Sequence, residues 1–206
     1  MAGVTIEIWA ALAVANFVAS LAPGQNIAYL TAATARTGLR GGLAALSGLL
    51  LAELLWSVLA LSLALGTRQV SPTLFQTLQV VGGLFLIWLG LGVLCDNADR
   101  SGGREETYGQ VKCAAQGVWV GLANPLALMF FLSLFPGFVA EDADATDPAV
   151  IVFYASAVLV SSSAGLAPYL IATGALARAG QARRLQMVSG STLLLLGALV
   201  MLRLLS

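Results

Sequence analysis

The chain has 206 residues with ten basic and ten acidic side chains, so its formal net charge is zero. Apolar residues make up 59% of the chain and charged residues only 10%, whereas about a quarter of a soluble domain is charged. This excludes an ordinary soluble domain, because a chain of this size would expose much of its apolar surface. The charge balance gives no indication of nucleic acid as a partner. With no histidine and only two cysteines, the sequence predicts neither a disulfide framework nor a metal site.

Six apolar runs are each long enough to form a helix across about 30 Å of hydrocarbon, which takes about 20 residues. No run alternates as barrel strands do, so the expected fold class is an all-α membrane protein with one transmembrane domain, residues 1–206. The first run is expected to be retained, because no basic residue precedes it as in a cleaved signal peptide. The expected spans are Ile6–Leu30, Gly41–Leu65, Leu74–Cys95, Gln116–Phe138, Ala149–Leu176 and Leu185–Leu205.

Basic residues concentrate in three of the five connections between these spans. By the positive-inside rule the first, third and fifth connections are cytoplasmic, which leaves both termini outside. The third connection, about residues 96–115, separates the two halves of the chain. The fourth is acidic over residues 141–147, which indicates either a solvated loop or a vestibule that attracts cations. The basic residues of the three cytoplasmic connections are Arg36, Arg40, Arg100, Arg104, Lys112, Arg178, Arg183 and Arg184.

An internal repeat relates the two halves. The pattern Leu78–Gly90 recurs as Leu185–Gly197 with an offset of 107 residues, and Phe17–Gly24 recurs as Phe130–Gly137 with an offset of 113. Each half, about residues 1–98 and about 113–206, holds three spans, and an odd number inverts the second half relative to the first. Two inverted three-helix repeats are an architecture of secondary transporters, which bind substrate where helices are broken near the midplane.

Proline marks where these helices are expected to break, since it frees the carbonyl four residues before it. In a membrane that carbonyl must find a partner or line a wet cavity. Breaks are expected at Pro23, Pro125 and Pro168, each accompanied by polar residues, although a lone kink is also an ordinary feature of membrane helices. Asn16 shares one helix face with Ser20 and Pro23. The proposed substrate-binding residues are Asn16, Pro23, Gly24, Gln25, Asn26, Asn124, Pro125, Ser162 and Tyr169.

Glu53 is the one ionisable residue near the middle of a span. A carboxylate at that depth costs about 2.5–3.5 kcal/mol on insertion scales, so such residues usually face a cavity and have a function. A carboxyl that can take up and release a proton suits proton coupling. The alternatives are a structural hydrogen bond to another helix and a countercharge to a cationic substrate.

Several of these elements together resemble the LysE/RhtB family of amino-acid exporters, over about residues 6–203. They are the break at residues 22–26, the glycines ahead of Glu53 and Trp56, and the Asn124-Pro125 motif with the following Phe135–Phe138. The chain departs from the family pattern at Ala22 and Gln25, where the motif usually reads Ser-Pro-Gly-Pro. It also has Leu126 in place of the family's lysine and Ser162 near its usual acidic residue. These departures bring the usual substrates into question.

The resemblance implies a secondary transporter in the inner membrane of a bacterial cell, exporting an amino acid or related small metabolite with a proton as the coupling ion. Lipid and a small-molecule substrate are the expected partners, and the chain could also form a homo-oligomer. No nucleophile–base pair or cofactor motif appears, so neither an enzyme nor a cofactor is expected. The alternatives are a membrane scaffold or accessory subunit without transport, and a metal-cation exporter. A single deep carboxylate without histidine argues against the last.

Overall fold

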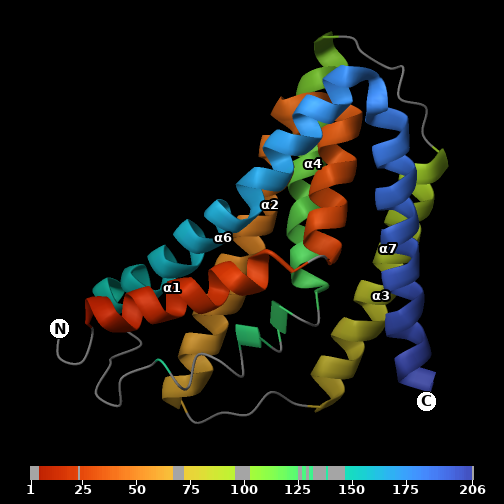
Figure 1. Ribbon diagram of the computed structural model, residues 1–206. Helices are drawn as coiled ribbons and strands as arrows, with labels where there is room; N and C mark the ends of the chain where they lie inside the picture. The colour runs from red at the N-terminus through yellow and green to blue at the C-terminus, as the bar shows by residue number, and fades with distance from the viewer. Residues whose placement is uncertain are drawn as a thin grey trace.

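The computed structural model describes residues 5–22, 24–66, 72–95, 103–124, 127–128, 130–131, 138 and 147–205. Throughout these residues the regular structure is helical and no strand occurs, which confirms the all-α class. Figure 1 shows the helices in a bundle, with α3 and α7 side by side along one edge. The elements are α1 (Ile6–Ser20), α2 (Gln25–Gly66), α3 (Pro72–Cys95), α4 (Gly103–Leu122), α6 (Pro148–Leu176), the π-helical turn η1 (Ala177–Gln181) and α7 (Ala182–Leu205).

The first expected span is broken in two at the predicted place. α1 ends at Ser20 and α2 begins at Gln25, with residues 21–24 between them outside helix. α1 has 15 residues and is therefore about 22 Å long, which is too short to cross about 30 Å of hydrocarbon alone. Figure 1 shows α1 steeply inclined to the neighbouring part of α2. The break thus places the N-terminus of α2 inside the bundle.

A single glycine replaces the loop that was expected between the first two spans. α2 has 42 residues and is helical except at Gly38, where φ is 71° and ψ is −170°. This left-handed backbone favours glycine, which has no Cβ to clash. The helix folds back there into two arms, residues 25–37 and 39–66, as Figure 1 shows. The second arm begins against the first, because Gly42 packs on Thr34.

Of three further features, one agrees with the expectation and two differ from it. α4 begins at Gly103, so much of the polar connection expected over residues 96–115 is helical. α4 ends at Leu122, so the span expected over Gln116–Phe138 is interrupted at Asn124, directly before the proline where a break was expected. The break expected at Pro168 is absent, because α6 is helical throughout its 29 residues. Its length, about 44 Å, exceeds the hydrocarbon thickness, which favours the inclined course seen in Figure 1.

The start of α6 gives one acidic residue of the fourth connection a structural role. The Asp147 side chain caps the helix by accepting a hydrogen bond of 2.9 Å from the Ala149 amide. Pro148 follows at the first helical position, where its missing N–H is not needed. The vestibule proposed for this connection rests on Glu141, Asp142 and Asp144 as well, which lie outside the described residues.

Small residues let the central helices approach closely. α2 packs most extensively on α4, where Gly117 lies against the backbone of Ala45 and Gly48. A methyl group on Gly117 would come within 2.5 Å of the Ala45 carbonyl oxygen. α3 packs on α7 in the same manner, and α6 packs on α1 and α2. These contacts agree with the packing role expected for small residues in membrane helices.

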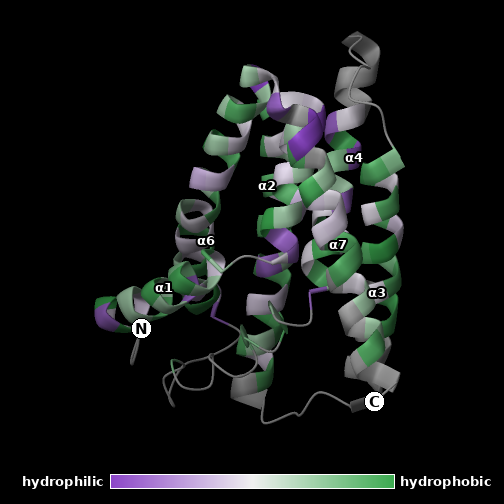
Figure 2. Cartoon of the chain, turned by 45° about the vertical axis from the view of Figure 1, so that its right-hand side comes forward, coloured by the Kyte–Doolittle hydropathy of each residue, from purple (hydrophilic) through white to green (hydrophobic). Residues whose placement is uncertain are grey.

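Two apolar clusters fill the bundle and leave a layer between them. One includes Leu49 and Leu166, and the other includes Trp56 and Val158. Residues four apart lie on one helix face. Glu53 therefore lies between the two clusters on α2, and Ser162 lies between them on α6. Figure 2 shows the corresponding hydrophilic band partway along α2, flanked by hydrophobic stretches.

Candidate functional site

Glu53 is buried in the layer between the two apolar clusters, with 5% of its surface exposed. Its Oε1 accepts a hydrogen bond of 3.2 Å from Asn26 Nδ2 at the start of α2. The Ser162 hydroxyl on α6 faces the same carboxyl. No hydrogen bond reaches Oε2, which is the one buried side-chain oxygen or nitrogen without a partner in the described part of the chain. The carboxyl therefore has one fixed oxygen and one oxygen available to a further donor.

Asn26 connects Glu53 to the break after α4. Its Oδ1 accepts a hydrogen bond of 3.2 Å from Asn124 Nδ2. Asn124 lies outside helix, and its own Oδ1 accepts from the Ala127 amide at 3.3 Å. The two interrupted spans thus meet through a pair of asparagine side chains beside a buried carboxyl.

Asn16 joins α1 to α6 on the other side of Ser162. The Asn16 side chain is buried, and its Nδ2 lies 2.8 Å from Ser161 Oγ and 2.7 Å from Ser162 Oγ. The Val158 carbonyl, at 3.3 Å, is a third acceptor for the same amide. Asn16, Asn26, Glu53, Asn124, Ser161 and Ser162 are called the polar cluster below.

The carbonyls near the helix breaks have side-chain partners from neighbouring helices. Proline at position 125 has no amide N–H to offer the Gly121 carbonyl, which accepts instead from the Asn124 amide at 3.3 Å and from Trp56 Nε1 at 3.2 Å. Gln25 Nε2 lies 2.6 Å from the Val120 carbonyl, and the Tyr169 hydroxyl lies 2.9 Å from that of Leu21. Gln25 and Tyr169 are expected from the sequence to contact substrate. In this structure their side chains donate hydrogen bonds to carbonyls at the helix breaks. These carbonyls need no solute as a partner.

The structure therefore brings together half of the ten site residues that the sequence predicts. Asn16, Asn26, Glu53, Asn124 and Ser162 share one cluster, and Gly24 immediately precedes α2. Pro23 and Pro125 lie outside the described residues. Ser161 and Trp56 lie in the same region, but the sequence did not predict them as site residues. For Trp56 the available signal was the proline at 125, which cannot donate an amide hydrogen bond to the carbonyl of Gly121.

Four members of the polar cluster are buried, whereas Asn26 and Asn124 are half-buried. Asn16, Glu53 and Ser162 are all buried. An open groove of about 700 Å³ runs between α2 and α6, but apolar side chains such as Leu55, Leu59 and Val152 line it. These three are among the exposed large hydrophobic residues that the hydrocarbon of a membrane would cover. Among the described residues no group of three or more His, Cys, Asp or Glu side chains could hold a metal ion.

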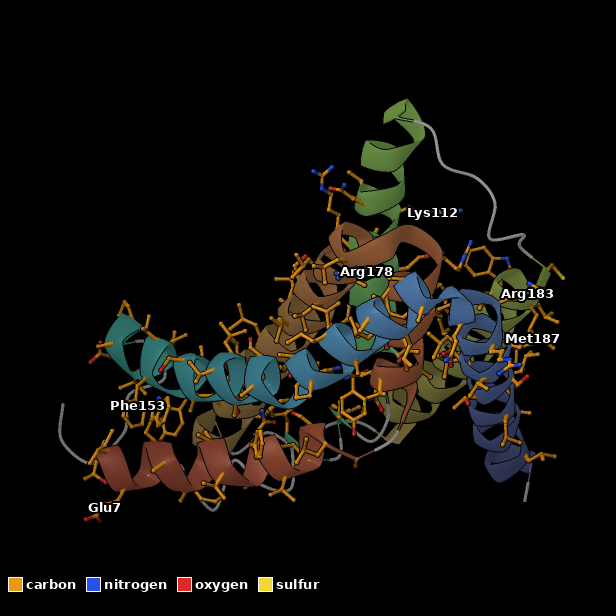
Figure 3. All side chains as sticks on the ribbon, turned by 45° about the horizontal axis from the view of Figure 1, so that its top comes forward. Glu7, Lys112, Phe153, Arg178, Arg183 and Met187 are labelled. Atoms are coloured by element: carbon orange, nitrogen blue, oxygen red, sulfur yellow. The ribbon has the colours of Figure 1, made fainter. Side chains whose placement is uncertain are left out.

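Basic side chains gather at one end of the bundle, away from the polar cluster. Figure 3 shows Lys112, Arg178 and Arg183 around the end at which α4 and α7 begin. Arg36 and Arg40 flank the bend of α2 at the same end, which Figure 1 shows beside the start of α4. Two of the described helices, residues 25–63 and 148–181, are long and apolar enough to cross a membrane, and α1 and residues 83–95 are shorter apolar helices.

Comparison with known proteins identifies relatives over most of the chain. An uncharacterized membrane protein of Pseudomonas aeruginosa is 29% identical over 181 residues, covering 84% of this chain and 82% of the relative. The leucine efflux protein of Salmonella typhimurium is 27% identical over 173 residues, covering 82% of this chain and 80% of its own. That of an Enterobacter species is 26% identical over 161 residues, covering 76% and 74%. No solved structure matches the chain.

The model of one protein family, the LysE type translocators, matches residues 17–204. The match includes both helix breaks and all but one residue of the polar cluster, Asn16. Proteins of this kind are membrane transporters and not enzymes. This chain belongs to the LysE type translocator family.

Proposed function

We propose that this protein exports an amino acid or a related small metabolite from the cytoplasm, and that protons entering through it drive the export. Two of its relatives are leucine efflux proteins, so an uncharged aliphatic amino acid is the first substrate to test. One feature of the site supports this proposal above all others. A buried carboxyl with one free oxygen lies where two interrupted spans meet.

Proton coupling is assigned to Glu53 on physical grounds. A buried carboxylate oxygen without a donor is unfavourable as an anion, whereas a protonated carboxyl avoids that cost. The group can therefore exist buried and neutral in a closed state, and ionised when water or substrate reaches it. The asparagine pair holds Oε1 in place, so Oε2 is the atom that would carry the proton.

Two inverted repeats would let such a site open alternately to each side. The packing of α3 on α7 supports this arrangement: Gly197 lies against the Gly83 carbonyl, and Gly90 lies against the Gly190 carbonyl. The repeat offset of 107 residues converts Gly83 into Gly190 and Gly90 into Gly197. Each contact thus maps onto the other, as a two-fold relation between the halves requires. The repeats would comprise about residues 1–98 and about 113–206.

The orientation follows from the charged end of the bundle. Basic residues near membrane helices remain on the cytoplasmic side. The end that carries Lys112, Arg178 and Arg183 would therefore face the cytoplasm, with both termini outside the inner membrane.

Purified protein in liposomes loaded with radiolabelled leucine provides the test. A pH gradient, acidic on the side opposite the leucine, should accelerate leucine efflux through the wild type. Glu53→Gln keeps the size of the side chain but cannot exchange a proton, so its efflux should not respond to the gradient. Glu7→Gln, which changes an exposed carboxyl on α1, should behave as wild type.

Two results would count against the proposal. Gradient-driven efflux through Glu53→Gln at the wild-type rate would remove Glu53 from the coupling. A wild type that moves neither leucine nor any other amino acid in a complete panel would favour the scaffold role.

A further inference from the structure

We infer that Glu53 binds the substrate's ammonium group as well as the proton, so that the two compete for one carboxyl, while the N-terminus of α2 receives the substrate's carboxylate. This inference rests on the proposed function and names its substrate class, the zwitterionic α-amino acid with a free amino group. It also assigns how substrate and proton are exchanged.

The free oxygen of Glu53 is matched to an ammonium group. Oε2 is buried without a donor, although Glu53 has 5% exposure and lies among polar side chains. An ammonium group has three donors and no acceptor, so it can bond to Oε2 and still reach a neighbouring acceptor such as the Ser162 hydroxyl. Bonds between an ionised donor and a carboxylate are about twice as strong as neutral ones. A proton satisfies the same oxygen, so ammonium and proton exclude each other.

The start of α2 supplies the complementary charge. A helix leaves its first N–H groups without acceptors inside the helix and carries partial positive charge at that end. Gly24 occupies the position before Gln25 and has no side chain of its own with which to cap the terminus. A methyl group added to Gly24 would have the Ala22 carbonyl oxygen, at 3.9 Å, as its neighbour, and no other described atom within 4 Å apart from those of the adjacent residues. Among the described residues, the side of Gly24 on which a Cβ would stand is therefore open.

The two charged elements are adjacent, as a zwitterion requires. Asn26 is the second residue of α2, and its side chain bonds directly to the Glu53 carboxyl. An α-amino acid carries its ammonium and carboxylate on one carbon, so their binding groups must also be neighbours. Broken membrane helices bind anionic substrate groups at such N-termini. The nearest basic side chain along α2 is Arg36, about 15 Å of helix beyond Asn26.

Competition for one carboxyl fixes the order and stoichiometry of exchange. On the cytoplasmic side the ammonium group binds as the Glu53 proton leaves to the cytoplasm. On the outer side the amino acid departs and Glu53 takes one proton from the medium. One zwitterion leaves for each proton that enters, so each cycle moves one positive charge inward.

Binding to the purified wild type tests this inference without any substitution. Leucine binding, measured by calorimetry in several buffers, should release about one proton per leucine wherever free Glu53 is protonated. Over that range its apparent Kd should fall about tenfold for each unit rise in pH. N-acetylleucine, which lacks the ammonium group, should not bind. Isoamylamine, which lacks the carboxylate, should bind more weakly than leucine but release the same proton.

Variants test the two ends of the ligand separately. Gly24→Ala places a methyl group before the helix N-terminus and should weaken leucine binding severalfold while leaving isoamylamine binding unchanged. Gly92→Ala on α3, which has open space around it, is the matched control and should change neither. Equal weakening of both ligands by Gly24→Ala would overturn the carboxylate assignment.

The outcomes separate this inference from the proposed function. Gradient-driven leucine efflux combined with leucine binding that releases no proton would overturn the competition and leave the exporter standing. Binding of N-acetylleucine as tight as that of leucine would do the same. Failure of every amino acid to move through the wild type would overturn both.

Discussion

At the scale of single residues, Trp56 shows how a side chain satisfies a carbonyl at a helix break. Its indole is buried, and its N–H gives the Gly121 carbonyl a second donor beside the Asn124 amide. Trp56→Phe keeps an aromatic ring but removes this donor. The variant should lose about 1 kcal/mol of stability, the usual net contribution of a buried hydrogen bond.

Thermal unfolding in detergent, followed by circular dichroism, would show this loss as a lower Tm. Trp119→Phe is the matched control, because Trp119 is on α4 and is exposed. A Tm for Trp56→Phe equal to that of this control would mean that the bond to Gly121 contributes nothing measurable.

The sequence located the polar residues of the site but not all of their partners. Asn16, Asn26, Asn124 and Glu53 stand out in apolar runs, because a polar group in hydrocarbon needs a partner or a function. Which of them bond to one another depends on the packing of α1, α2 and α6, and no local pattern gives that. Gln25 illustrates the consequence: it was selected as a substrate ligand, yet its amide donates to the Val120 carbonyl.

At the scale of helices, glycines set the distance between α2 and α4. Gly117 lies against the Ala45 carbonyl and the Gly48 backbone, so an added methyl group would overlap main-chain atoms that cannot rotate away. Gly117→Ala should separate the two helices and cost about 1–3 kcal/mol, as overpacked interiors do. The separation would also move Glu53 away from Asn124, which reduces transport.

Gly109→Ala gives the control on the same helix. Gly109 has open space around it, so alanine there should be neutral or raise stability by up to about 1 kcal/mol through its helix propensity. Comparing the Tm and leucine efflux of the two variants separates the effect of the close approach of α2 and α4 from the effect of alanine's helix propensity. Equal stability of the two would show that the α2–α4 contact tolerates a wider spacing.

Helix boundaries were predictable where the breaking residues act locally, and not elsewhere. The break before Gln25 was predicted, since proline and glycine together interrupt a helix. The bend at Gly38 was expected as a loop, because a hydropathy pattern does not show that one glycine can reverse a helix. At Pro168 a break was expected, but α6 continues through the proline as a helix. Membrane helices tolerate proline when neighbouring groups satisfy the freed carbonyl.

At the scale of the whole molecule, uneven charge gives the bundle a direction. Basic side chains lie at the end where α2 bends and α4 begins. The acidic Glu7 lies far from that end, at the start of α1 (Figure 3). Because acidic residues contribute little to orientation, the basic end alone predicts which side is cytoplasmic.

Cysteine labelling in cells tests that orientation. Cys95 is exposed at the last residue of α3, and Figure 1 shows this end of α3 on the basic side of the bundle. A membrane-impermeant maleimide should therefore not label Cys95 in intact cells, but should label it in inside-out vesicles. Cys113 is buried against Tyr29, whose hydroxyl bonds to the Cys113 carbonyl, so it should react slowly from either side. Cys95→Ser, which leaves only Cys113, should abolish the vesicle signal. Labelling of Cys95 from outside intact cells would reverse the molecule in the membrane, and with it the direction in which the exporter works.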